Sequence, residues 1–224
     1  MDLYKLVKEN ELMIGKCIKG LVHISHKAST IANRWNRIIY SWYTLNKKYN
    51  IDTIFTVDAE SIIPYKYTAR GLYIQEIPFQ QTLFIHCESG AVAIIIIDLR
   101  EDSPTYRVYN RITLEARDQN MDAVYIPKGC AYGFVTLEDN TILKIKTDNY
   151  FNKDYEKRIN LMDPYYNICV PYPEKSSPPI PISELIAQNK IKISAEDRQA
   201  PWTHEVIKNQ PIFSKEEQED IKCG

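Results

Sequence analysis

Hydrophobic residues in the middle of the chain come in short runs that turn-forming residues separate. The runs recur roughly every ten residues with no helical period between them, which favours an all-β sandwich or jelly roll over a βαβ sheet. The pattern predicts strands over residues 54–57, 72–75, 82–85, 92–98, 107–113, 123–126, 134–137 and 142–147. The run at 92–97 is apolar on both faces, so we expect it to form a central strand.

Polar, glycine- and proline-containing segments mark the predicted turns between these strands. They lie at 88–90, 102–104, 127–129 and 138–140. The first of them predicts that one strand ends near residue 85 and a second one begins near residue 92.

A helical period precedes the strands. Ser29 is a good N-cap residue, and after it apolar residues recur at steps of three and four, at Ile31, Trp35, Ile38, Trp42 and Leu45. This stripe predicts an amphipathic helix that packs on the domain or on a partner subunit. We therefore divide the chain into an N-terminal segment with a helix (1–52), a jelly-roll core (53–164) and an irregular, Pro-rich and charged C-terminal extension packing on the core (165–224), with one short helix at 183–189.

Composition narrows the classes of function. The chain has 28 Lys and Arg against 29 Asp and Glu, so it lacks the basic excess that generic nucleic-acid binding needs. The longest apolar run is far shorter than the ~20 residues of a membrane span, and the N-terminus does not resemble a signal peptide. Five scattered cysteines without a CxxC pair indicate reduced thiols in a cytoplasmic protein. His86 has no second histidine two residues away, so we expect no metal and no cofactor.

Six short segments carry a more specific signal because they occur in one order. They are Arg70-Gly71-Leu72-Tyr73-Ile74-Gln75, the stretch 90–106, the stretch 126–137, the stretch 146–150, Asp163-Pro164 and the stretch 193–201. Together they cover about residues 53–201 and resemble the dTDP-4-dehydrorhamnose 3,5-epimerase family, whose members are cupin jelly rolls. The resemblance implies a homodimer without metal that acts on a nucleotide-linked 4-keto sugar.

The resemblance also implies a proton-transfer reaction. The ketone at C4 of the sugar acidifies the protons on C3 and C5. In the family, a histidine held by an aspartate removes such a proton, a lysine steadies the enolate oxygen and a tyrosine reprotonates the other face. A base with a pKa near neutral pH, oriented by a carboxylate, suits this task.

The proton-transfer positions of this chain depart from the family pattern. Tyr73 stands where the family has its histidine base, and Tyr132 stands where it has a second histidine. Thr82 aligns with the lysine and Ile145 with the tyrosine acid. The family's N-terminal Arg-Gly-x-Phe-x-Glu signature, which helps to hold the nucleotide, is not visible in residues 1–50.

Three polar residues of the family pattern remain. Asp163 is expected where the partner carboxylate of the base would lie, or as the cap of a turn before Pro164. The resemblance places Arg70 on the substrate's diphosphate and makes Gln75 a substrate-binding residue, although both can also be structural. A free tyrosine titrates near ~10, and a nearby carboxylate raises that pKa, so Tyr73 beside Asp163 would be a hydrogen-bond donor and a poor base.

Each of the remaining polar candidates is either a site residue or a structural residue. Tyr73 and Tyr132 line a retained sugar pocket or fill it, since tyrosine has an apolar face and a polar tip. Asp98 and Arg100 are predicted to form a structural pair at the end of a strand.

We therefore predict an epimerase-like cupin of nucleotide-sugar metabolism that is cytoplasmic and homodimeric. It binds an NDP-4-keto-sugar or a relative, with the His/Lys/Tyr chemistry lost or altered. Catalytic candidates are Asp163, Tyr73 and Tyr132. One alternative is a non-catalytic partner subunit of another sugar enzyme, and another is an epimerase that uses unusual acid and base groups. No nucleic acid or membrane partner is expected.

Overall fold

The computed structural model describes residues 18–27, 29–31, 35–37, 47, 51–117, 120–171 and 178–207. Its strands are β1 (Val22–Lys27), β2 (Ser29–Ile31), β3 (Trp35–Arg37), β4 (Val57–Ile63), β5 (Ala69–Gln75), β6 (Leu83–Asp98), β7 (Tyr109–Arg117), β8 (Asn120–Ile126), β9 (Cys130–Thr136), β10 (Thr141–Thr147), β11 (Glu156–Arg158), β12 (Cys169–Val170) and β13 (Ile180–Pro181). The short helices are η1 (Lys153–Tyr155), α3 (Ile182–Ala187), α4 (Ala195–Arg198) and α5 (Thr203–Ile207). The all-β prediction is confirmed.

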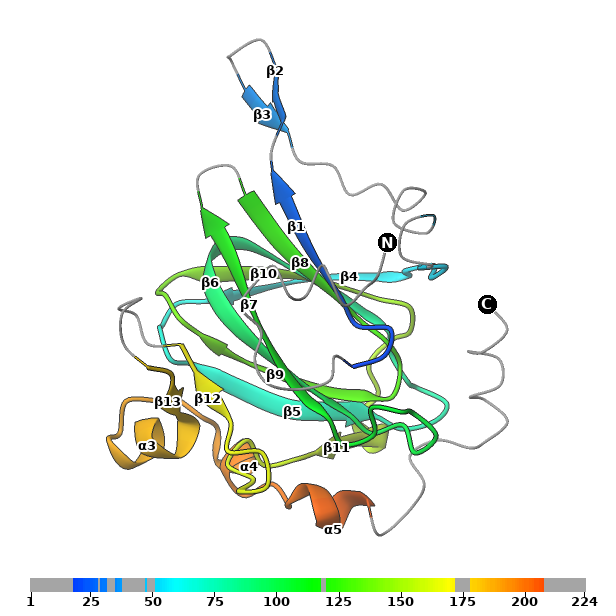
Figure 1. Cartoon of the computed structure of the whole chain (residues 1–224), viewed down its shortest axis with the longest axis vertical. Coiled ribbons are helices and arrows are strands. Elements are labelled where there is room, and N and C mark those ends of the chain that lie inside the picture. The colour runs from blue at the N-terminus through cyan, green and yellow to red at the C-terminus, as the bar shows by residue number, and fades with distance from the viewer. Residues whose placement is uncertain are drawn as a thin grey trace.

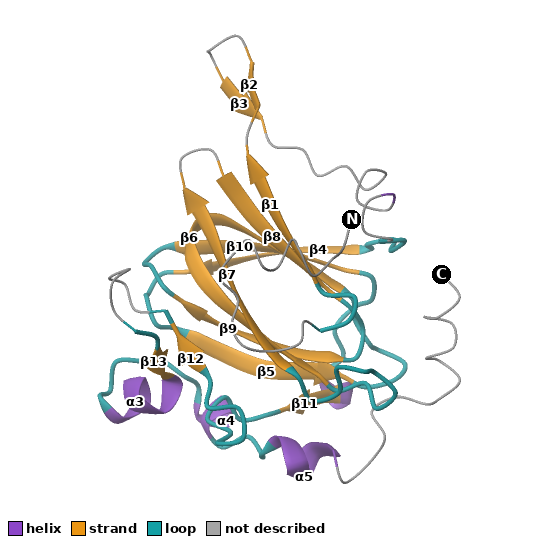
Figure 2. Cartoon of the chain, viewed as in Figure 1, coloured by secondary structure: helices purple, strands orange, loops and turns teal. Residues whose placement is uncertain are grey.

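One large antiparallel sheet curves around the core (Figure 1). Its strands follow the order β1-β8-β7-β6-β9-β5-β11, and β10 joins it by pairing with both β6 and β4. Helices α3, α4 and α5 gather on one side of the body, next to β5, β11 and β12 (Figure 2). No helix among the described residues is long and apolar enough to cross a membrane.

Strand β6 runs unbroken through the predicted turn at 88–90, which corrects that prediction. Its first part pairs with β8 and β10, and its second part pairs with β7 and β9. The strand changes neighbours at Gly90, which has a φ of +77°. A Cβ at this position would lie 2.6 Å from Oγ1 of Thr141, so the close approach of β10 requires glycine there. The turn-like residues mark a bend within one strand and not a connection between two.

The second half of β6 is the centre of the core, as its apolar pattern predicts. Ala93, Ile95 and Ile97 belong to one hydrophobic cluster, which the C-terminal extension covers. The alternate residues Val92, Ile94 and Ile96 belong to a second cluster. Successive side chains of a strand point to opposite faces, so a strand that is buried on both faces reads as a continuous apolar run.

The N-terminal region differs from its prediction. Strand β1 pairs with β8, so the sheet begins well before residue 53. Strands β2 and β3 pair with each other as a hairpin, which corrects the predicted helix over these residues. Three-residue strands offer too little periodicity to be told from a helical stripe by spacing alone. Ile38, Trp42 and Leu45 of that stripe lie outside the described residues.

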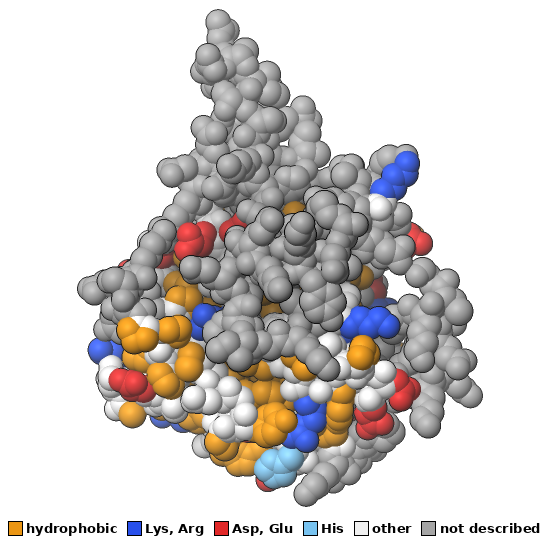
Figure 3. Space-filling view, in the orientation of Figure 1, with side chains coloured by type: hydrophobic (Ala, Val, Ile, Leu, Met, Phe, Trp, Pro, Cys, Tyr) orange, Lys and Arg blue, Asp and Glu red, His pale blue; other side chains and the backbone are white. Residues whose placement is uncertain are grey.

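The C-terminal extension folds against the core through short elements. Strands β12 and β13 pair with each other. Helix α3 covers nearly the same residues as the helix predicted at 183–189. Ile168, Val170, Ile182 and Leu185 are buried in the same cluster as Leu72 of β5. This packing brings α4 next to β5, which positions the candidate site. On the face seen in Figure 3, basic side chains are scattered singly over the described part and do not gather into a patch.

Candidate functional site

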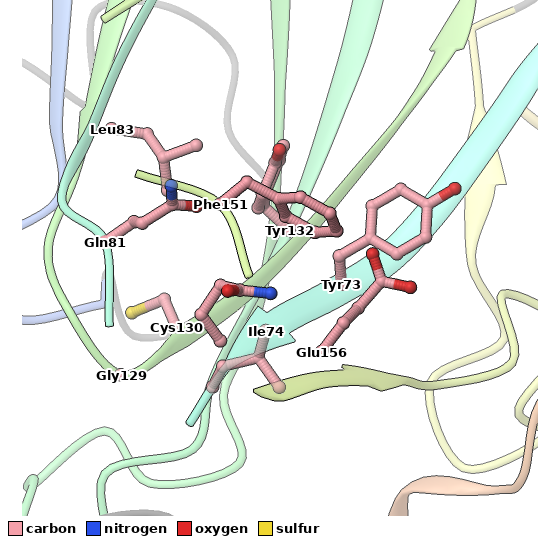
Figure 4. A pocket seen from close by; sticks show the side chains of 10 residues that line it. Tyr73, Ile74, Gln81, Leu83, Gly129, Cys130, Tyr132, Phe151 and Glu156 are labelled. Atoms are coloured by element: carbon pink, nitrogen blue, oxygen red, sulfur yellow. The ribbon is translucent and has the colours of Figure 1, made fainter. Parts of the chain in front are cut away.

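A small cavity lies where the ends of β5, β9 and β11 meet the loops around residues 81 and 151 (Figure 4). It measures about 50 Å³. Its lining consists of Tyr73, Ile74, Gln75, Gln81, Leu83, Gly129, Cys130, Tyr132, Phe151 and Glu156. The volume is far below the ~300–1,000 Å³ of a typical small-molecule site. It still accommodates a few groups of the size of a water molecule, because each needs only ~10–15 Å³.

The two predicted tyrosines meet in this cavity. Tyr73 of β5 and Tyr132 of β9 are direct cross-strand partners, and their rings lie edge to face with centroids 6.3 Å apart. The register between β5 and β9 shifts just before Tyr73, at Gly71. Gly71 has a φ of +91°, and a Cβ there would lie 2.7 Å from the carbonyl oxygen of Tyr132. The glycine therefore sets the register that faces the two tyrosines toward each other.

The hydroxyl of Tyr73 donates a hydrogen bond to Oδ2 of Asp197, at 2.9 Å. Asp197 lies in helix α4 and its side chain is fully buried. Burial raises the pKa of Tyr73, and the charge and hydrogen bond of Asp197 raise it further. Figure 4 shows this hydroxyl pointing away from the other labelled side chains of the cavity. Tyr73 is therefore a protonated donor at neutral pH that contributes its ring to the cavity.

Asp163 does not take the role predicted for it, which is a correction. Its Oδ1 accepts from the backbone N–H of Tyr165 at 3.0 Å, and its Oδ2 accepts from that of Thr203 at 2.8 Å. Both carboxylate oxygens thus fasten a turn to the start of α5, as in the alternative reading of Asp163 as a turn cap. The partner of Tyr73 is Asp197, which the sequence did not single out. Asp197 does lie in the stretch 193–201, one of the six segments whose order resembles the family. Spacing alone cannot say which carboxylate of that stretch reaches Tyr73.

Arg158 of β11 was also missed, and it joins three carboxylates. Its Nε lies 2.6 Å from Oε1 of Glu156, and its Nη1 lies 3.1 Å from Oδ1 of Asp197 and 2.6 Å from Oε2 of Glu196. Its guanidinium also lies 5.4 Å from the centroid of the Tyr73 ring. Asp197 is therefore held from two sides, by Arg158 at Oδ1 and by the hydroxyl of Tyr73 at Oδ2.

Only one of the two predicted substrate-binding residues lines the cavity. Arg70 is not part of the lining; its side chain is half exposed, and its Nη1 is 4.0 Å from Oδ2 of Asp197. Gln75 lines the cavity and is 7% exposed. Its Oε1 accepts a hydrogen bond from the backbone N–H of Asn152 at 2.9 Å, so the amide oxygen of Gln75 stabilises the fold.

The lining of the cavity contains no histidine and no lysine. Burial raises the pKa of Tyr132 to about 12, with a smaller contribution from the charge of Glu156. Thr82 is buried, and its backbone N–H donates a hydrogen bond to Oδ1 of Asp148. Ile145 packs against the second hydrophobic cluster. Neither of these two side chains ionises. Among the described residues, no group of three His, Cys, Asp or Glu side chains is arranged to hold a metal ion.

Asp98 and Arg100 form the predicted structural pair and are not themselves among the residues that line the cavity. Arg100 donates from Nε to Oδ1 of Asp98 at 2.8 Å and from Nη2 to Oδ2 at 2.9 Å. Burial alone would raise the pKa of Asp98, but its hydrogen bonds with Arg100, Ser103 and Thr105 hold that pKa below its ordinary value. This pair anchors the turn after β6.

Comparisons with known proteins agree with this fold. A dTDP-4-dehydrorhamnose 3,5-epimerase of Mycobacterium tuberculosis is 27% identical over 133 residues, which are 59% of this chain and 65% of that protein. The enzyme of the same name from Shigella flexneri is 34% identical over 99 residues, which are 44% of this chain and 54% of that protein. The aligned part therefore spans between about half and two thirds of the length of these relatives.

A solved structure and the family as a whole extend the comparison. The dTDP-4-dehydrorhamnose 3,5-epimerase of Bacillus anthracis, with TDP and PPi bound, is 31% identical with a TM-score of 0.59, over 73% of this chain and 82% of that one. Residues 17–205 match the family of dTDP-4-dehydrorhamnose 3,5-epimerase, and this match covers most of the chain. The chain therefore belongs to the dTDP-4-dehydrorhamnose 3,5-epimerase family.

Proposed function

We propose that this protein binds a nucleotide-linked sugar, a dTDP-4-keto-hexose or a close relative, without the family's proton-transfer chemistry. One observation carries the proposal. The side chain at the base position, Tyr73, donates a hydrogen bond to Asp197, and its pKa lies above the ordinary tyrosine value. A group that keeps its proton at neutral pH cannot take one from C3 or C5 of a sugar.

The ligand class follows from the family and from what remains of the site. The Bacillus anthracis relative holds TDP, a nucleoside diphosphate. Arg70 is half exposed, which suits contact with a diphosphate. Gln75 and Tyr132 line the cavity and offer hydrogen bonds to a sugar. Catalytic roles for Tyr73, Tyr132 and Asp163 are not part of this proposal.

Assembly and location form a second part of the proposal. We expect a homodimer, because the family resemblance implies a dimer, and we propose the cytoplasm as its location. The three described cysteines, Cys87, Cys130 and Cys169, are free, which is compatible with a reducing compartment. Sedimentation equilibrium of the full chain tests the dimer.

Two measurements test the proposed function. A thermal-shift series with dTDP-, UDP-, GDP- and CDP-sugars should show that at least one of them raises the melting temperature, because a ligand that binds only the folded state stabilises it. Incubation with a 4-keto sugar nucleotide in deuterium oxide should leave C3 and C5 protonated. Stabilisation by none of these ligands would contradict binding. Deuterium at C3 or C5 would instead support an epimerase with unusual acid and base groups.

A second candidate is a non-catalytic partner of another sugar enzyme. The small cavity favours it, and so does the charge around Tyr73. Two guanidinium groups, Arg70 and Arg158, face the three carboxylates of Glu156, Glu196 and Asp197, so these groups leave no positive excess for a diphosphate. Co-purification with a sugar dehydratase, reductase or transferase, together with no response to nucleotide sugars, would favour this candidate. A monodisperse homodimer that nucleotide sugars stabilise would count against it.

A further inference from the structure

The cavity at the ends of β5, β9 and β11 is lined by three aromatic rings and one carboxylate. Tyr73, Tyr132 and Phe151 contribute the rings, which Figure 4 shows grouped around the cavity. Glu156 contributes the carboxylate, and the lining contains no lysine, arginine or histidine. The face of an aromatic ring carries partial negative charge, so rings and carboxylates attract the same kind of ligand group. The composition of the lining therefore favours a cation.

The charge of Glu156 acts inside the cavity. Its side chain is 11% exposed, so water and salt screen the carboxylate less than they screen a surface charge. Burial is the main cause of the raised pKa of Tyr132, and the negative charge of Glu156 raises that pKa further. The field of the carboxylate thus extends to Tyr132, and a cation placed between the two is attracted by both.

Arg158 does not cancel this charge, because two carboxylates share its guanidinium. Its Nε lies 2.6 Å from Oε1 of Glu156, and its Nη1 lies 3.1 Å from Oδ1 of the fully buried Asp197. Two negative groups and one positive group leave one negative charge in excess. Glu196 and Arg70, which are 74% and 49% exposed, add one charge of each sign and do not change this balance.

A cation already lies against one ring of the lining. The guanidinium of Arg158 is 5.4 Å from the centroid of the Tyr73 ring, within the ~6 Å range of a cation–π contact. The local charges therefore hold a positive group beside an aromatic ring at the edge of the cavity. Tyr132 and Phe151 are the two further rings that the lining offers to a ligand.

The volume of the cavity restricts the cation to a small one. The cavity measures about 50 Å³, and a group of the size of a water molecule needs ~10–15 Å³. An ammonium group on one or two carbons fits this space, whereas a diphosphate does not. A metal ion is a poorer match, because magnesium and calcium take six or more oxygen ligands. The described residues also contain no group of three His, Cys, Asp or Glu side chains that could hold a metal ion.

We propose that this cavity binds the ammonium group of an amine between Phe151, Tyr132 and Glu156, and that an aminodeoxy sugar carries this amine. The sugar ring lies outside the cavity, which is too small for it, and Phe151 is 56% exposed at the opening. The site for the ammonium group does not depend on the proposed function. The assignment of the amine to a nucleotide-linked sugar rests on that function.

The first experiment uses the ammonium group alone. The full chain is titrated with methylammonium chloride at an ionic strength held constant with sodium chloride, and saturation-transfer NMR follows the methyl protons. We expect a dissociation constant on the order of 1 mM, which a few cation–π contacts and one carboxylate provide. Methanol has the same shape without the charge, so it should give no transfer at the same concentration.

Matched variants locate the site. Phe151→Leu removes one ring at a largely exposed position and should weaken methylammonium binding about two- to fivefold. Glu156→Gln removes the charge and should weaken it about tenfold. Tyr150→Leu is the control, because Tyr150 is 61% exposed and does not line the cavity, so the affinity should stay the same. Thermal unfolding checks that each variant is folded.

The second experiment identifies the carrier of the amine. Isothermal titration compares dTDP-4-amino-4,6-dideoxyglucose with dTDP-quinovose, which has a hydroxyl in place of the amine. We expect the amino sugar to bind at least about fivefold more tightly, since it adds a charged contact to the same nucleotide. Glu156→Gln should reduce this preference to about twofold or less.

The outcomes separate the ammonium site from the proposed function. Methylammonium binding that Phe151→Leu and Glu156→Gln weaken and Tyr150→Leu retains supports the site. Equal responses to methylammonium and methanol overturn it, and so does binding that both lining variants leave unchanged. Equal affinity for the two nucleotide sugars overturns the aminodeoxy sugar and leaves the proposed function standing. Binding of methylammonium but of neither nucleotide sugar supports a site for a free amine and overturns the proposed function.

Discussion

Two buried aspartates, each paired with an arginine, show how differently a sequence can encode a charge pair. The side chains of Asp98 and Asp197 are both fully buried. Asp98 takes its side-chain partners from Arg100, Ser103 and Thr105, within seven residues. Asp197 is instead bonded to Arg158, 39 residues away, and to Tyr73, 124 residues away. The first pair closes a turn, whereas the second joins three elements at the cavity.

The distance along the chain decides what each pair can do. The pair of Asp98 and Arg100 forms with its turn, and Arg100 also donates from Nη2 to the carbonyl oxygen of Lys19 at 2.7 Å. The pair at Asp197 exists only after α4 has packed against β5 and β11, so its members are held by tertiary structure. Arg158 is more exposed than Arg100, 27% against 9%, so we expect breaking the pair at Asp197 to cost less stability.

The largest expected effect on stability comes from breaking the local pair. Asp98→Ala leaves the guanidinium of Arg100 buried without its partner, which should lower the free energy of unfolding by about 3–5 kcal/mol. Urea denaturation of this variant and of Asp102→Ala, at an exposed position in the next turn, measures the difference. A loss of less than about 1 kcal/mol for Asp98→Ala would remove the contrast between the two pairs.

Tyr73→His should sharpen the contrast between the two aspartates, because it places a histidine base beside Asp197. The imidazole would lie beside Asp197, and a free histidine titrates near ~6.5, whereas a free tyrosine titrates near ~10. General-base catalysis contributes about 10²–10⁴-fold. We expect proton exchange at C3 or C5 of a 4-keto sugar nucleotide to rise by about 10²-fold, as NMR in deuterium oxide would record. Exchange that stays at the level of the unmodified chain would argue that the sugar does not approach position 73.

Asp197→Asn should have a smaller effect on stability than Asp98→Ala. The amide oxygen can still accept from Tyr73, while the charge that pairs with Arg158 is lost. We expect a loss of about 1–3 kcal/mol, which is the range for hydrogen bonds to charged groups. A double-mutant cycle that combines Asp197→Ala with Tyr73→Phe, followed by urea denaturation, isolates the Tyr73–Asp197 interaction. A coupling energy near zero would mean that the 2.9 Å contact contributes nothing to stability.

The smallest effect concerns Tyr132 at alkaline pH. Its pKa is raised to about 12 in the folded chain, against ~10 for a free tyrosine. The stability that its neutral form contributes is complete below pH ~10 and is lost as the pH rises toward 12. Denaturation midpoints between pH 9 and 11 should therefore fall less steeply for Tyr132→Phe than for the unmodified chain. Parallel pH curves would place this hydroxyl in a solvated environment.

Cross-strand pairing illustrates how far the candidate site could be predicted. The meeting of Tyr73 and Tyr132 follows from two motifs that the sequence displays, because antiparallel strands set residues directly opposite one another. Asp163 is not the partner of Tyr73, because its two carboxylate oxygens accept hydrogen bonds from the backbone N–H groups of Tyr165 and Thr203. A carboxylate's place in a chain does not reveal which donors surround it after folding.

By itself, the sequence determined the all-β class, the central strand of β6, the tyrosines at the proton-transfer positions and the pair of Asp98 and Arg100. Each of these depends on residue type or on neighbours a few positions apart, which periodicity and turn chemistry express directly. Only the tertiary structure decided that β6 is one strand, that β1 joins the sheet, and that Asp197 and Arg158 hold Tyr73. These features need segments far apart in the chain to pack together, and the energy of such contacts has no local signature in the sequence.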